Sequence, residues 1–371
     1  MDRAGITDPE YNVRGAIVAG IGDAGIYAVA TYTTSRRLRP LHGRLATDAV
    51  ALQFGMRFFL VGPTAVGKTA LAIELAEKFD AEIVNADAFQ VYCGLDVLTA
   101  KPDAEAQRRV RHHLLGQISL TETMSAAKFR ELACGALADI HLRKKNAIVV
   151  GGSGLYLKGI TRGFDQVPPP DPKLRQELSV LPLKELAERL QKLSLELAAR
   201  TDLRNPRRVV RAIEIASAST VIPSEAQRSR AIPRRDLRAH ATGSFDFAEA
   251  DPRMNPSGVL LLRDRADLYQ RINDRVNAMF RDGVEEEVRA LAEVGPTAAS
   301  ALGFKEIRAL ITGQISREEC IAKIQQATRR YAKRQLTWFR HQTSFPQLNL
   351  TPFSHREAVR AITQMFHRAQ E

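Results

Sequence analysis

Eight consecutive residues have the types and spacing of a phosphate-binding loop. They are Gly62, Pro63, Thr64, Ala65, Val66, Gly67, Lys68 and Thr69, and they match the pattern G-x-x-x-x-G-K-[ST]. The glycines of such a loop let the backbone curl so that successive N–H groups point at an anion. Lys68 adds a full positive charge, and the Thr69 hydroxyl could hold a magnesium ion. We therefore expect a di- or triphosphate here, with Mg²⁺ as the cofactor.

The residues around this loop predict the elements that it requires. Residues 58–61 are a short apolar run that is typical of a buried strand. Residues 70–76 are strong helix formers. The N-terminus of that helix would add partial positive charge at the loop. Because both flanks fit, a chance match in a glycine-containing turn is the less favoured interpretation.

A carboxylate follows the next apolar run. Residues 81–86 predict a second strand, and Asp87 comes directly after it. Ligands of open parallel sheets lie at the carboxyl ends of the strands, so Asp87 is expected near the phosphate loop. The alternative is an aspartate that only caps a helix or a loop. A third strand, residues 147–150, runs into a glycine-rich turn at 151–156 that should face the same crevice.

Two arginines could clamp a pyrophosphate. Arg271 and Arg275 are four residues apart, so they share one face of the helix predicted after the strand at 259–262. The alternative is pairing at the surface with Asp267 or Asp274.

Two further segments carry clustered cations. Residues 207–211 begin a helix after Asn205 and Pro206 and present arginines that could contact phosphates. The helix predicted at about 317–341 interleaves cations with Tyr331, Trp338 and Phe339, a pattern that suits stacking together with phosphate binding. In the alternative interpretation these arginines form a solvated face and the aromatic rings belong to the core.

The whole-chain composition is compatible with a nucleic-acid partner. The 371 residues carry a formal net charge of +12 and are 44% hydrophobic, which predicts a globular protein with room for two domains. The excess charge favours a polyanion such as nucleic acid, although it could also serve solubility. The three cysteines form no C-x-x-C pair, which argues against a disulfide framework or a zinc site and favours a cytoplasmic location. No apolar run approaches the ~20 residues of a membrane span.

The patterns predict an α/β fold with a parallel sheet and an insertion. We assign the core to residues 56–165 and 257–345, and an inserted, mainly helical domain to 166–256. Three prolines at 168–170 mark the first boundary. Residues 346–371 are expected to form a C-terminal tail helix.

Two stretches lack a regular pattern. Residues 217–256 are expected to form a long basic loop. Residues 1–55 are expected to be poorly ordered and have three interpretations: a transit-like arm, a genuine basic extension, or upstream sequence joined by a misassigned start. Asp2, Asp8, Glu10 and Asp23 argue against the first, because such presequences are poor in acidic residues. We favour the third, with Met56 as the true first residue, because the first core strand begins immediately after it.

Together these motifs resemble the tRNA dimethylallyltransferases, also called tRNA isopentenyltransferases. Seven segments match in the family's order and cover roughly residues 57–345. They are GPTAVGKT (62–69), DAFQVYCGLDVLTAKP (87–102), GGSGLY (151–156), NPRRVVRAIEI (205–215), RINDRVNAMFRDGVEEEV (271–288), ALGFKE (301–306) and TRRYAKRQLTWFR (328–340). The resemblance implies a P-loop kinase-like core with an inserted helical domain.

The resemblance also implies an activity. The family transfers a dimethylallyl group from dimethylallyl diphosphate to the exocyclic amine of the adenine just 3′ of the anticodon, in tRNAs that read codons starting with U. The phosphate loop would then hold the diphosphate of the prenyl donor, and no covalent nucleophile is required. The implied partners are the donor and the anticodon stem-loop of tRNA, with no membrane and a monomeric protein.

Roles for individual residues follow from the matched motifs. Asp87 would accept a proton or hydrogen bond from the target amine, while Lys68, Thr69 and Arg275 would bind the diphosphate and magnesium. The residues implied in tRNA binding are Asp87, Ala88, Phe89, Gln90, Gly154, Arg207, Arg208, Val209, Val210, Arg211, Gly303, Phe304, Lys305, Arg329, Arg330, Lys333 and Arg334.

Two positions depart from the family pattern. The family usually has serine where this chain has Ala88, which removes a hydrogen bond worth roughly 0.5–1.5 kcal/mol. It usually has glycine where this chain has Leu98, so a left-handed backbone is not expected there. These departures keep open a catalytically weak or silent tRNA-binding paralogue. A small-molecule P-loop kinase and a prenyltransferase of free adenine nucleotides also stay open, and the basic segments count against the second of these two.

Overall fold

The computed structural model describes residues 20–22, 25–27, 56–164, 170–220 and 257–368. The chain divides into two compact units, residues 1–52 and 53–371. In the first unit, strands β1 (Gly20–Gly22) and β2 (Gly25–Tyr27) pair antiparallel. Apart from this hairpin, the predictions for residues 1–55 lie outside the described residues. The same is true of the predicted basic loop beyond residue 220.

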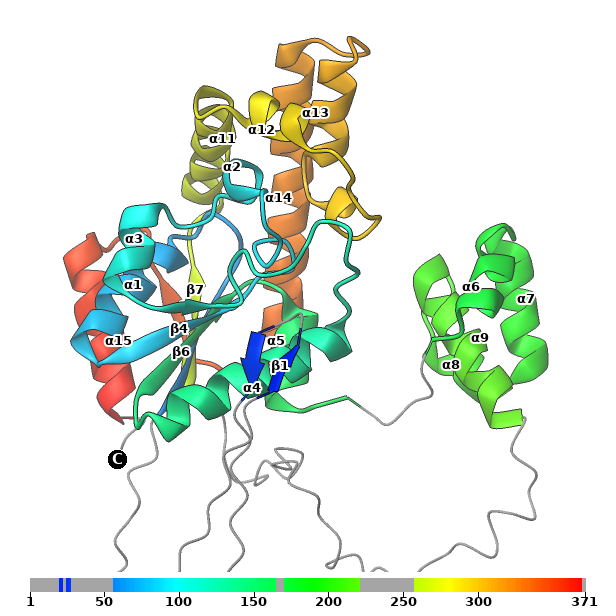
Figure 1. Cartoon of the computed structure of the whole chain (residues 1–371), viewed down its shortest axis with the longest axis horizontal. Coiled ribbons are helices and arrows are strands. Elements are labelled where there is room, and N and C mark those ends of the chain that lie inside the picture. The colour runs from blue at the N-terminus through cyan, green and yellow to red at the C-terminus, as the bar shows by residue number, and fades with distance from the viewer. Residues whose placement is uncertain (1–19, 23–24, 28–55, 165–169, 221–256, 369–371) are drawn as a thin grey trace, which may run out of the picture. The chain divides into compact units, whose positions relative to one another are not determined.

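A six-stranded parallel sheet forms the centre of the second unit (Figure 1). Its strands are β3 (Arg57–Val61), β4 (Ala81–Ala86), β5 (His112–His113), β6 (Asn146–Gly151), β7 (Gly258–Leu262) and β8 (Gln347–Asn349). Their order is β5-β4-β6-β3-β7-β8, and every neighbouring pair is parallel. The predicted parallel α/β fold is confirmed.

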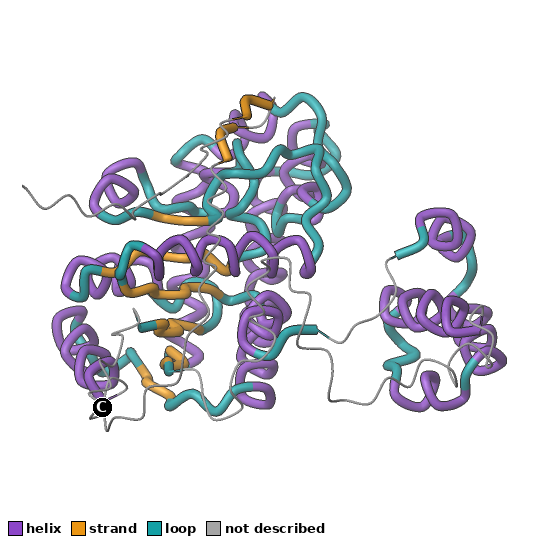
Figure 2. Tube along the Cα trace, turned by 60° about the horizontal axis from the view of Figure 1, so that its bottom comes forward, coloured by secondary structure: helices purple, strands orange, loops and turns teal. Residues whose placement is uncertain are grey.

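Both faces of the sheet are covered by helices, which explains why its strands are apolar without alternation. In β3, Phe58 and Leu60 belong to one buried cluster, and Phe59 and Val61 belong to another. The first cluster includes side chains from α1 (Lys68–Lys78) and α15 (His355–Arg368). The second includes side chains from α4 (Ala126–Leu142) and α5 (Gly154–Thr161). Figure 2 shows the helices on both sides of the strands.

The C-terminal residues belong to this core. We expected only a tail helix after residue 345, but β8 pairs with β7 and forms an edge of the sheet. Phe366 of α15 stacks on Phe79 with ring centroids 3.8 Å apart. The core therefore continues past the predicted boundary, because a short strand and an amphipathic helix both find apolar surface to bury.

Further helices surround the carboxyl ends of the strands. They are α2 (Asp96–Thr99), α3 (Ala104–Arg109), α11 (Arg265–Arg281), α12 (Val284–Ala290), η1 (Ala298–Ser300), α13 (Phe304–Ile311) and α14 (Arg317–Gln342). The longest, α14, begins after Ser316, whose hydroxyl accepts the Glu319 N–H. Its bounds agree with the predicted helix at 317–341.

Four helices form a cluster with an apolar core of its own. They are α6 (Pro172–Ser179), α7 (Leu183–Leu193), α8 (Leu195–Arg200) and α9 (Pro206–Thr220). Leu178, Leu190 and Ile213 are fully buried inside it. The helix α9 continues to residue 220, past the point where we expected irregular structure. No helix among the described residues is long and apolar enough to cross a membrane.

Candidate active site

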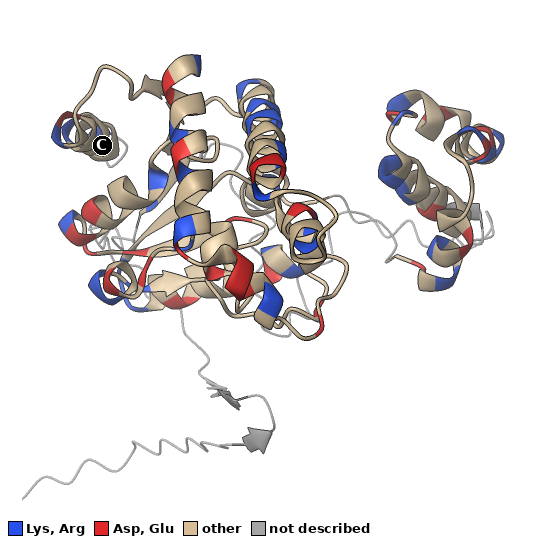
Figure 3. Cartoon of the chain, turned by 90° about the horizontal axis from the view of Figure 1, so that it is seen from above, with Lys and Arg blue, Asp and Glu red and all other residues tan. Residues whose placement is uncertain are grey.

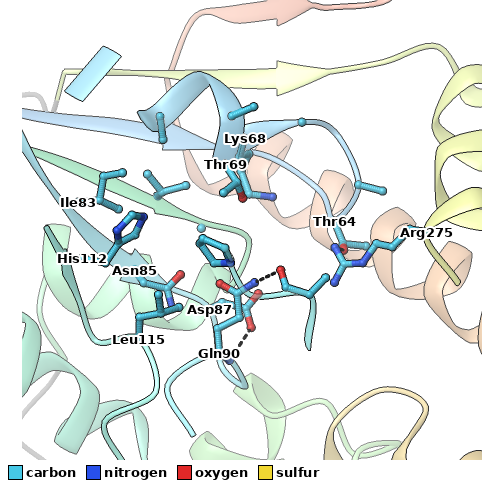
Figure 4. A pocket seen from close by; sticks show the side chains of 18 of the residues that line it. Thr64, Lys68, Thr69, Ile83, Asn85, Asp87, Gln90, His112, Leu115 and Arg275 are labelled. Atoms are coloured by element: carbon cyan, nitrogen blue, oxygen red, sulfur yellow. Dashed lines mark hydrogen bonds between the residues drawn. The ribbon is translucent and has the colours of Figure 1, made fainter. Parts of the chain in front are cut away.

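The carboxyl ends of four parallel strands bring the predicted chemistry together. The phosphate loop follows β3, Asp87 follows β4, the glycine turn follows β6 and Arg263 follows β7. The phosphate loop, Asp87 and the glycine turn line a pocket of about 510 Å³. Figure 4 shows Lys68 and Thr69 on one side of it and Asp87 and Gln90 on the other, with Thr64 and Arg275 at one end.

The loop has the backbone geometry that its glycines predict. At Gly62 φ is +157°, and a Cβ atom would lie 2.6 Å from the Leu261 carbonyl oxygen. Gly67 has φ +104° and precedes the first residue of α1. The strained position between them is Ala65, whose φ is +63°. Any side chain at position 62 would displace the loop, because its Cβ atom would clash with the Leu261 carbonyl oxygen.

Lys68 is held by the loop itself. Its ammonium Nζ donates to the carbonyl oxygens of Gly62 and Pro63, at 3.0 and 2.8 Å. Burial lowers the pKa of Lys68 to about 8, while the charge of Asp87 raises it and that of Arg275 lowers it. The ammonium group is thus short of negative charge, and a bound polyanion would stabilise it.

Arg271 and Arg275 lie on one helix face and both reach the loop, as their spacing predicts. Arg275 donates from Nη1 to the Thr64 hydroxyl at 3.1 Å and from Nη2 to the Thr99 carbonyl at 2.9 Å. Arg271 donates from Nε to the Ala65 carbonyl at 3.2 Å. Burial lowers the pKa of Arg275, and the charge of Asp87 opposes this. These contacts point both arginines at the loop, which favours the clamp over pairing at the surface.

A third arginine at the loop was missed from the sequence. Arg263 donates from Nε to the Val66 carbonyl at 3.0 Å and pairs with Asp267 at 2.7 Å. It directly follows β7, so the rule that ligands lie at strand ends could have found it.

The position of Asp87 is compatible with both interpretations of this residue. Its Oδ1 accepts the backbone N–H groups of Phe89 and Gln90, at 3.0 and 3.4 Å, which orders the loop that follows. The carboxylate also lines the pocket. Among the described residues, Oδ2 has no hydrogen-bond partner. One oxygen is therefore available to a ligand while the other fixes the side chain.

Hydroxyl groups lie near Asp87 although Ala88 supplies none. The Ala88 N–H donates to Oγ of Ser153, in the glycine turn, at 3.0 Å. Tyr331 of α14 lies against Ser153 and Gln335. Burial, with the Asp87 charge, raises the pKa of the Tyr331 phenol to about 12, so it stays neutral at physiological pH.

The second departure, Leu98, lies in a helix. It belongs to α2, is buried and contacts Gly303, where a Cβ would come within 3.3 Å of the Leu98 side chain. The expectation that its backbone is not left-handed is confirmed, and Ala100 has the positive φ of +47° instead.

Glu287 accepts three N–H groups at the start of α2, those of Asp96, Val97 and Leu98, at 2.6 to 2.8 Å.

The core residues predicted to bind tRNA have different environments. Gln90 donates to the carbonyls of Thr99 and Ala100, at 3.0 and 3.1 Å, and Phe89 is half-buried. Gly154 lies so close to Trp338 that a Cβ would be 2.2 Å from the ring. Lys305 is exposed.

Two of the residues predicted to bind tRNA have buried side chains, so these side chains are not accessible to a ligand in this structure. Phe304 packs in the main core, and Val209 is fully buried in the cluster of α6 to α9. Both fall on the apolar face of an amphipathic helix, where the match to a motif says nothing about exposure. Gly303, with φ +94°, is the residue before α13, and Val210 is half-buried.

The basic clusters are only partly free to bind RNA. Arg330, Lys333 and Arg334 of α14 are exposed, but Arg329 donates to Asn273 at 2.6 Å. Among the aromatic residues of this helix, Phe339 is in the core, as the alternative interpretation expects.

The three arginines of α9 also divide. Arg207 and Arg208 are exposed, whereas Arg211 pairs at 2.9 Å with the buried Glu214, which also binds Arg175. The blue segments of the ribbon in Figure 3 mark the positions of Lys and Arg, which are spread over many helices.

A metal ion would need ligands from the substrate. No group of three or more His, Cys, Asp or Glu residues in the described part of the chain could hold one. Magnesium binds through few protein ligands when phosphates supply the others. The Thr69 hydroxyl lines the same pocket as Asp87 and fits that donor set.

Comparisons with known proteins agree with this arrangement. The model of the IPP transferase family matches residues 90–342. The chain is 40% identical over 284 residues to a tRNA dimethylallyltransferase 1 of Citrifermentans bemidjiense, covering 76% of this chain and 87% of the relative. It is 42% identical to a tRNA dimethylallyltransferase of Anaeromyxobacter dehalogenans, covering 77% and 92%.

A solved structure is also similar. The tRNA isopentenylpyrophosphate transferase of Bacillus halodurans superposes with a TM-score of 0.58 at 30% sequence identity, covering 85% of this chain and 98% of that one. The family match spans more than half of the chain, and the two relatives match over about three quarters of it. The chain belongs to the IPP transferase family.

Proposed function

We propose that this protein transfers a dimethylallyl group from dimethylallyl diphosphate to the exocyclic amine of a tRNA adenine, releasing diphosphate. The target is the adenine 3′ of the anticodon in tRNAs that read U-starting codons. One observation supports this most. A phosphate loop surrounded by Lys68, Arg271 and Arg275 shares its pocket with a carboxylate oxygen that has no partner in the described part of the chain. The relatives named above carry the same activity in their names.

The cations would act on the leaving group. As the C–O bond to the prenyl carbon breaks, negative charge grows on the diphosphate. Preorganised cations at that position lower the barrier, because they cost no reorganisation during the reaction. Lys68 and Arg275 are placed to do this, and Thr69 would hold Mg²⁺, which supplies further positive charge to the diphosphate.

The carboxylate would act on the acceptor. The lone pair of an adenine amine is delocalised, so the amine is a weak nucleophile and gains positive charge as it attacks. Asp87 Oδ2 could accept its proton or a hydrogen bond and offset that charge. The base must leave its stack to reach the pocket. The neutral Tyr331 phenol, and the Ser153 hydroxyl that accepts the Ala88 N–H, would offer hydrogen bonds to the extruded base.

The remaining properties follow from the same proposal. The anticodon stem-loop is the part of tRNA that the enzyme must bind, and the exposed cations of α9 and α14 would contact its phosphates. We propose a monomer that acts in the cytoplasm, where tRNA is available.

Prenyl transfer is tested with labelled dimethylallyl diphosphate, unmodified tRNA and Mg²⁺. The wild-type chain should label the anticodon loop. Asp87→Asn should lower kcat by about 10²- to 10⁴-fold, the range for a positioned acid or base, and leave the Kd of the donor within about threefold. Asp282→Asn, at an exposed aspartate after α11, is the matched control. A collapse of donor affinity in Asp87→Asn would show that the assigned role is wrong.

Ala88 keeps open a protein that binds tRNA without modifying it, and the same experiment tests this alternative. If the chain only binds tRNA, the stem-loop should be retained with no transfer of label. ATP hydrolysis, or ATP binding tighter than that of the donor, would instead indicate a small-molecule kinase.

A further inference from the structure

Gln335 connects two loops of the active site from inside α14. Its side chain is buried, with 5% of its surface exposed. The amide oxygen Oε1 accepts the Thr64 N–H of the phosphate loop at 2.9 Å. The amide nitrogen Nε2 donates to the Gly152 carbonyl of the turn after β6, also at 2.9 Å. One neutral side chain therefore forms a hydrogen bond with the backbone of each loop.

The neighbouring backbone leaves room for this amide and little else. A Cβ atom at residue 152 would lie 2.3 Å from Nε2 of Gln335 and 3.0 Å from the Gly62 carbonyl oxygen. The glycine turn and the phosphate loop can approach each other only because Gly152 has no side chain. The position of the amide is thus fixed from both sides.

The other contacts to the loop are of a different kind. Lys68 donates to loop carbonyls, Arg271 to the Ala65 carbonyl and Arg275 to the Thr64 hydroxyl. All three groups are cations bonded to neutral oxygens. A cation forms a stronger hydrogen bond with an anionic oxygen than with a neutral one. A bound diphosphate would therefore draw these side chains away from the loop.

Gln335 has no charge and does not gain from such an exchange. When Arg275 leaves the Thr64 hydroxyl, the bond from Gln335 continues to hold the Thr64 peptide. Thr64 directly precedes Ala65, whose positive φ is unfavourable and persists only where the surrounding structure holds it.

We propose that Gln335 is a positioning residue that keeps the phosphate loop in its binding shape while the cations move from the loop to the diphosphate. The inference rests on the proposed function for the identity of the donor, but it concerns the binding of any diphosphate. It predicts that Gln335 acts on donor affinity and not on the reactivity of Asp87.

Two substitutions separate this role from simple packing. Gln335→Met keeps the length of the side chain and removes both hydrogen bonds. Gln335→Glu keeps the shape, and its protonated form can still accept from Thr64 and donate to Gly152. The ionised form cannot donate, and it places a negative charge beside the diphosphate. Protonation also removes that negative charge, which by itself would raise the affinity only to that of Gln335→Met. Recovery beyond the methionine variant as the pH falls requires the restored hydrogen bonds.

The full-length chain is titrated by calorimetry with Mg²⁺ and, separately, with inorganic pyrophosphate and dimethylallyl diphosphate. The range from pH 5.5 to 7.5 keeps Lys68 protonated, and each Kd is divided by the wild-type Kd at the same pH. Gln326→Met, an exposed glutamine of the same helix, is the matched control. Thermal unfolding of every variant is recorded alongside.

Gln335→Met should bind both ligands roughly tenfold more weakly at every pH, as expected when two buried backbone groups lose their partner. Gln335→Glu should be weaker than Gln335→Met at pH 7.5 and approach the wild type at pH 5.5. Pyrophosphate affinity within twofold of wild type in Gln335→Met would overturn the proposal. So would a glutamate variant whose relative affinity does not change with pH, even if the methionine variant is unstable.

Failure of the proposed function would look different. If the wild-type chain binds pyrophosphate but transfers no prenyl group to tRNA, the assigned reaction is wrong. The effect of Gln335 on diphosphate affinity would still be measured.

Discussion

Raising the pH above neutrality should weaken donor binding through Lys68. In the free protein, burial lowers the pKa of Lys68 from 10.5 to about 8. A bound diphosphate favours the ammonium form and raises that pKa again. Below pH 8 the lysine is already protonated and the Kd should not depend on it. Above pH 8 binding must take up a proton, so the Kd should increase with pH.

The size of this effect follows from the shift. Restoring the ordinary pKa of 10.5 in the complex would be worth about 3 kcal/mol of extra attraction for the protonated lysine. In that case the Kd should rise by about tenfold for each pH unit between 8 and 10, because one proton is taken up per ligand. Between pH 7 and pH 9 we expect an increase of roughly tenfold.

The assay needs no turnover. Dimethylallyl diphosphate is titrated into the protein by calorimetry without tRNA, at constant Mg²⁺, between pH 7 and pH 9.5. Titrations in buffers of different ionisation enthalpy count the protons taken up. Lys68→Met should bind weakly with no such dependence on pH. Lys78→Met, which changes an exposed lysine at the other end of α1, should behave as wild type.

Two results would refute this reasoning. A wild-type Kd that stays constant from pH 7 to pH 9.5, with no proton uptake, would mean that Lys68 has an ordinary pKa or does not contact the diphosphate. The same pH dependence in Lys68→Met would assign the titration to another group.

Three further substitutions test the parts that support the site. Gly154→Ala should destabilise the protein by about 1–3 kcal/mol in urea unfolding, because its Cβ would lie 2.2 Å from the Trp338 ring. Glu82→Gln should cost about 1–3 kcal/mol, because the buried Glu82 loses charge-assisted hydrogen bonds from Arg143, which keeps Asp139 as a partner. Burial would raise the pKa of Glu82, but hydrogen bonds from Arg143 and His113 outweigh this and lower it. Its contribution should therefore be full above pH 4.5, the ordinary pKa, and be lost as the pH falls further, and a pH-independent stability difference from Glu82→Gln would contradict this. Glu287→Ala should release α2 and raise hydrogen exchange of its first three amides, and unchanged exchange would show that other contacts hold α2.

The parts of the site that lie close together in the sequence could be predicted from it. The phosphate loop has a fixed spacing, and the strand and helix beside it follow from apolar runs and helix formers. Asp87 was found because strand ends gather on one edge of a parallel sheet. Arg271 and Arg275 were found because residues four apart share a helix face. Each of these inferences needs only local periodicity and one rule of topology.

The side chains that act over long separations could not be predicted in this way. Gln335 and Thr64 are 271 residues apart, and Glu287 caps a helix 189 to 191 residues before it. A glutamine or glutamate within a charged helix has no local signal that it will bond to the backbone of a distant segment. In the same way, the matched motifs did not reveal that the side chains of Val209 and Phe304 are turned inward.

The contacts of the phosphate loop explain how it can keep its conformation while its cations become available to a diphosphate. If cations alone held the loop, binding the diphosphate would remove the bonds that shape its binding site. If neutral groups alone held it, little charge would be available for the leaving group. Here the two tasks belong to different residues: Lys68 and Arg275 have lowered pKa values and gain most from an anion, whereas Gln335 is neutral and buried. Removing the cations should therefore lower affinity and rate together, while removing Gln335 should change mainly the affinity.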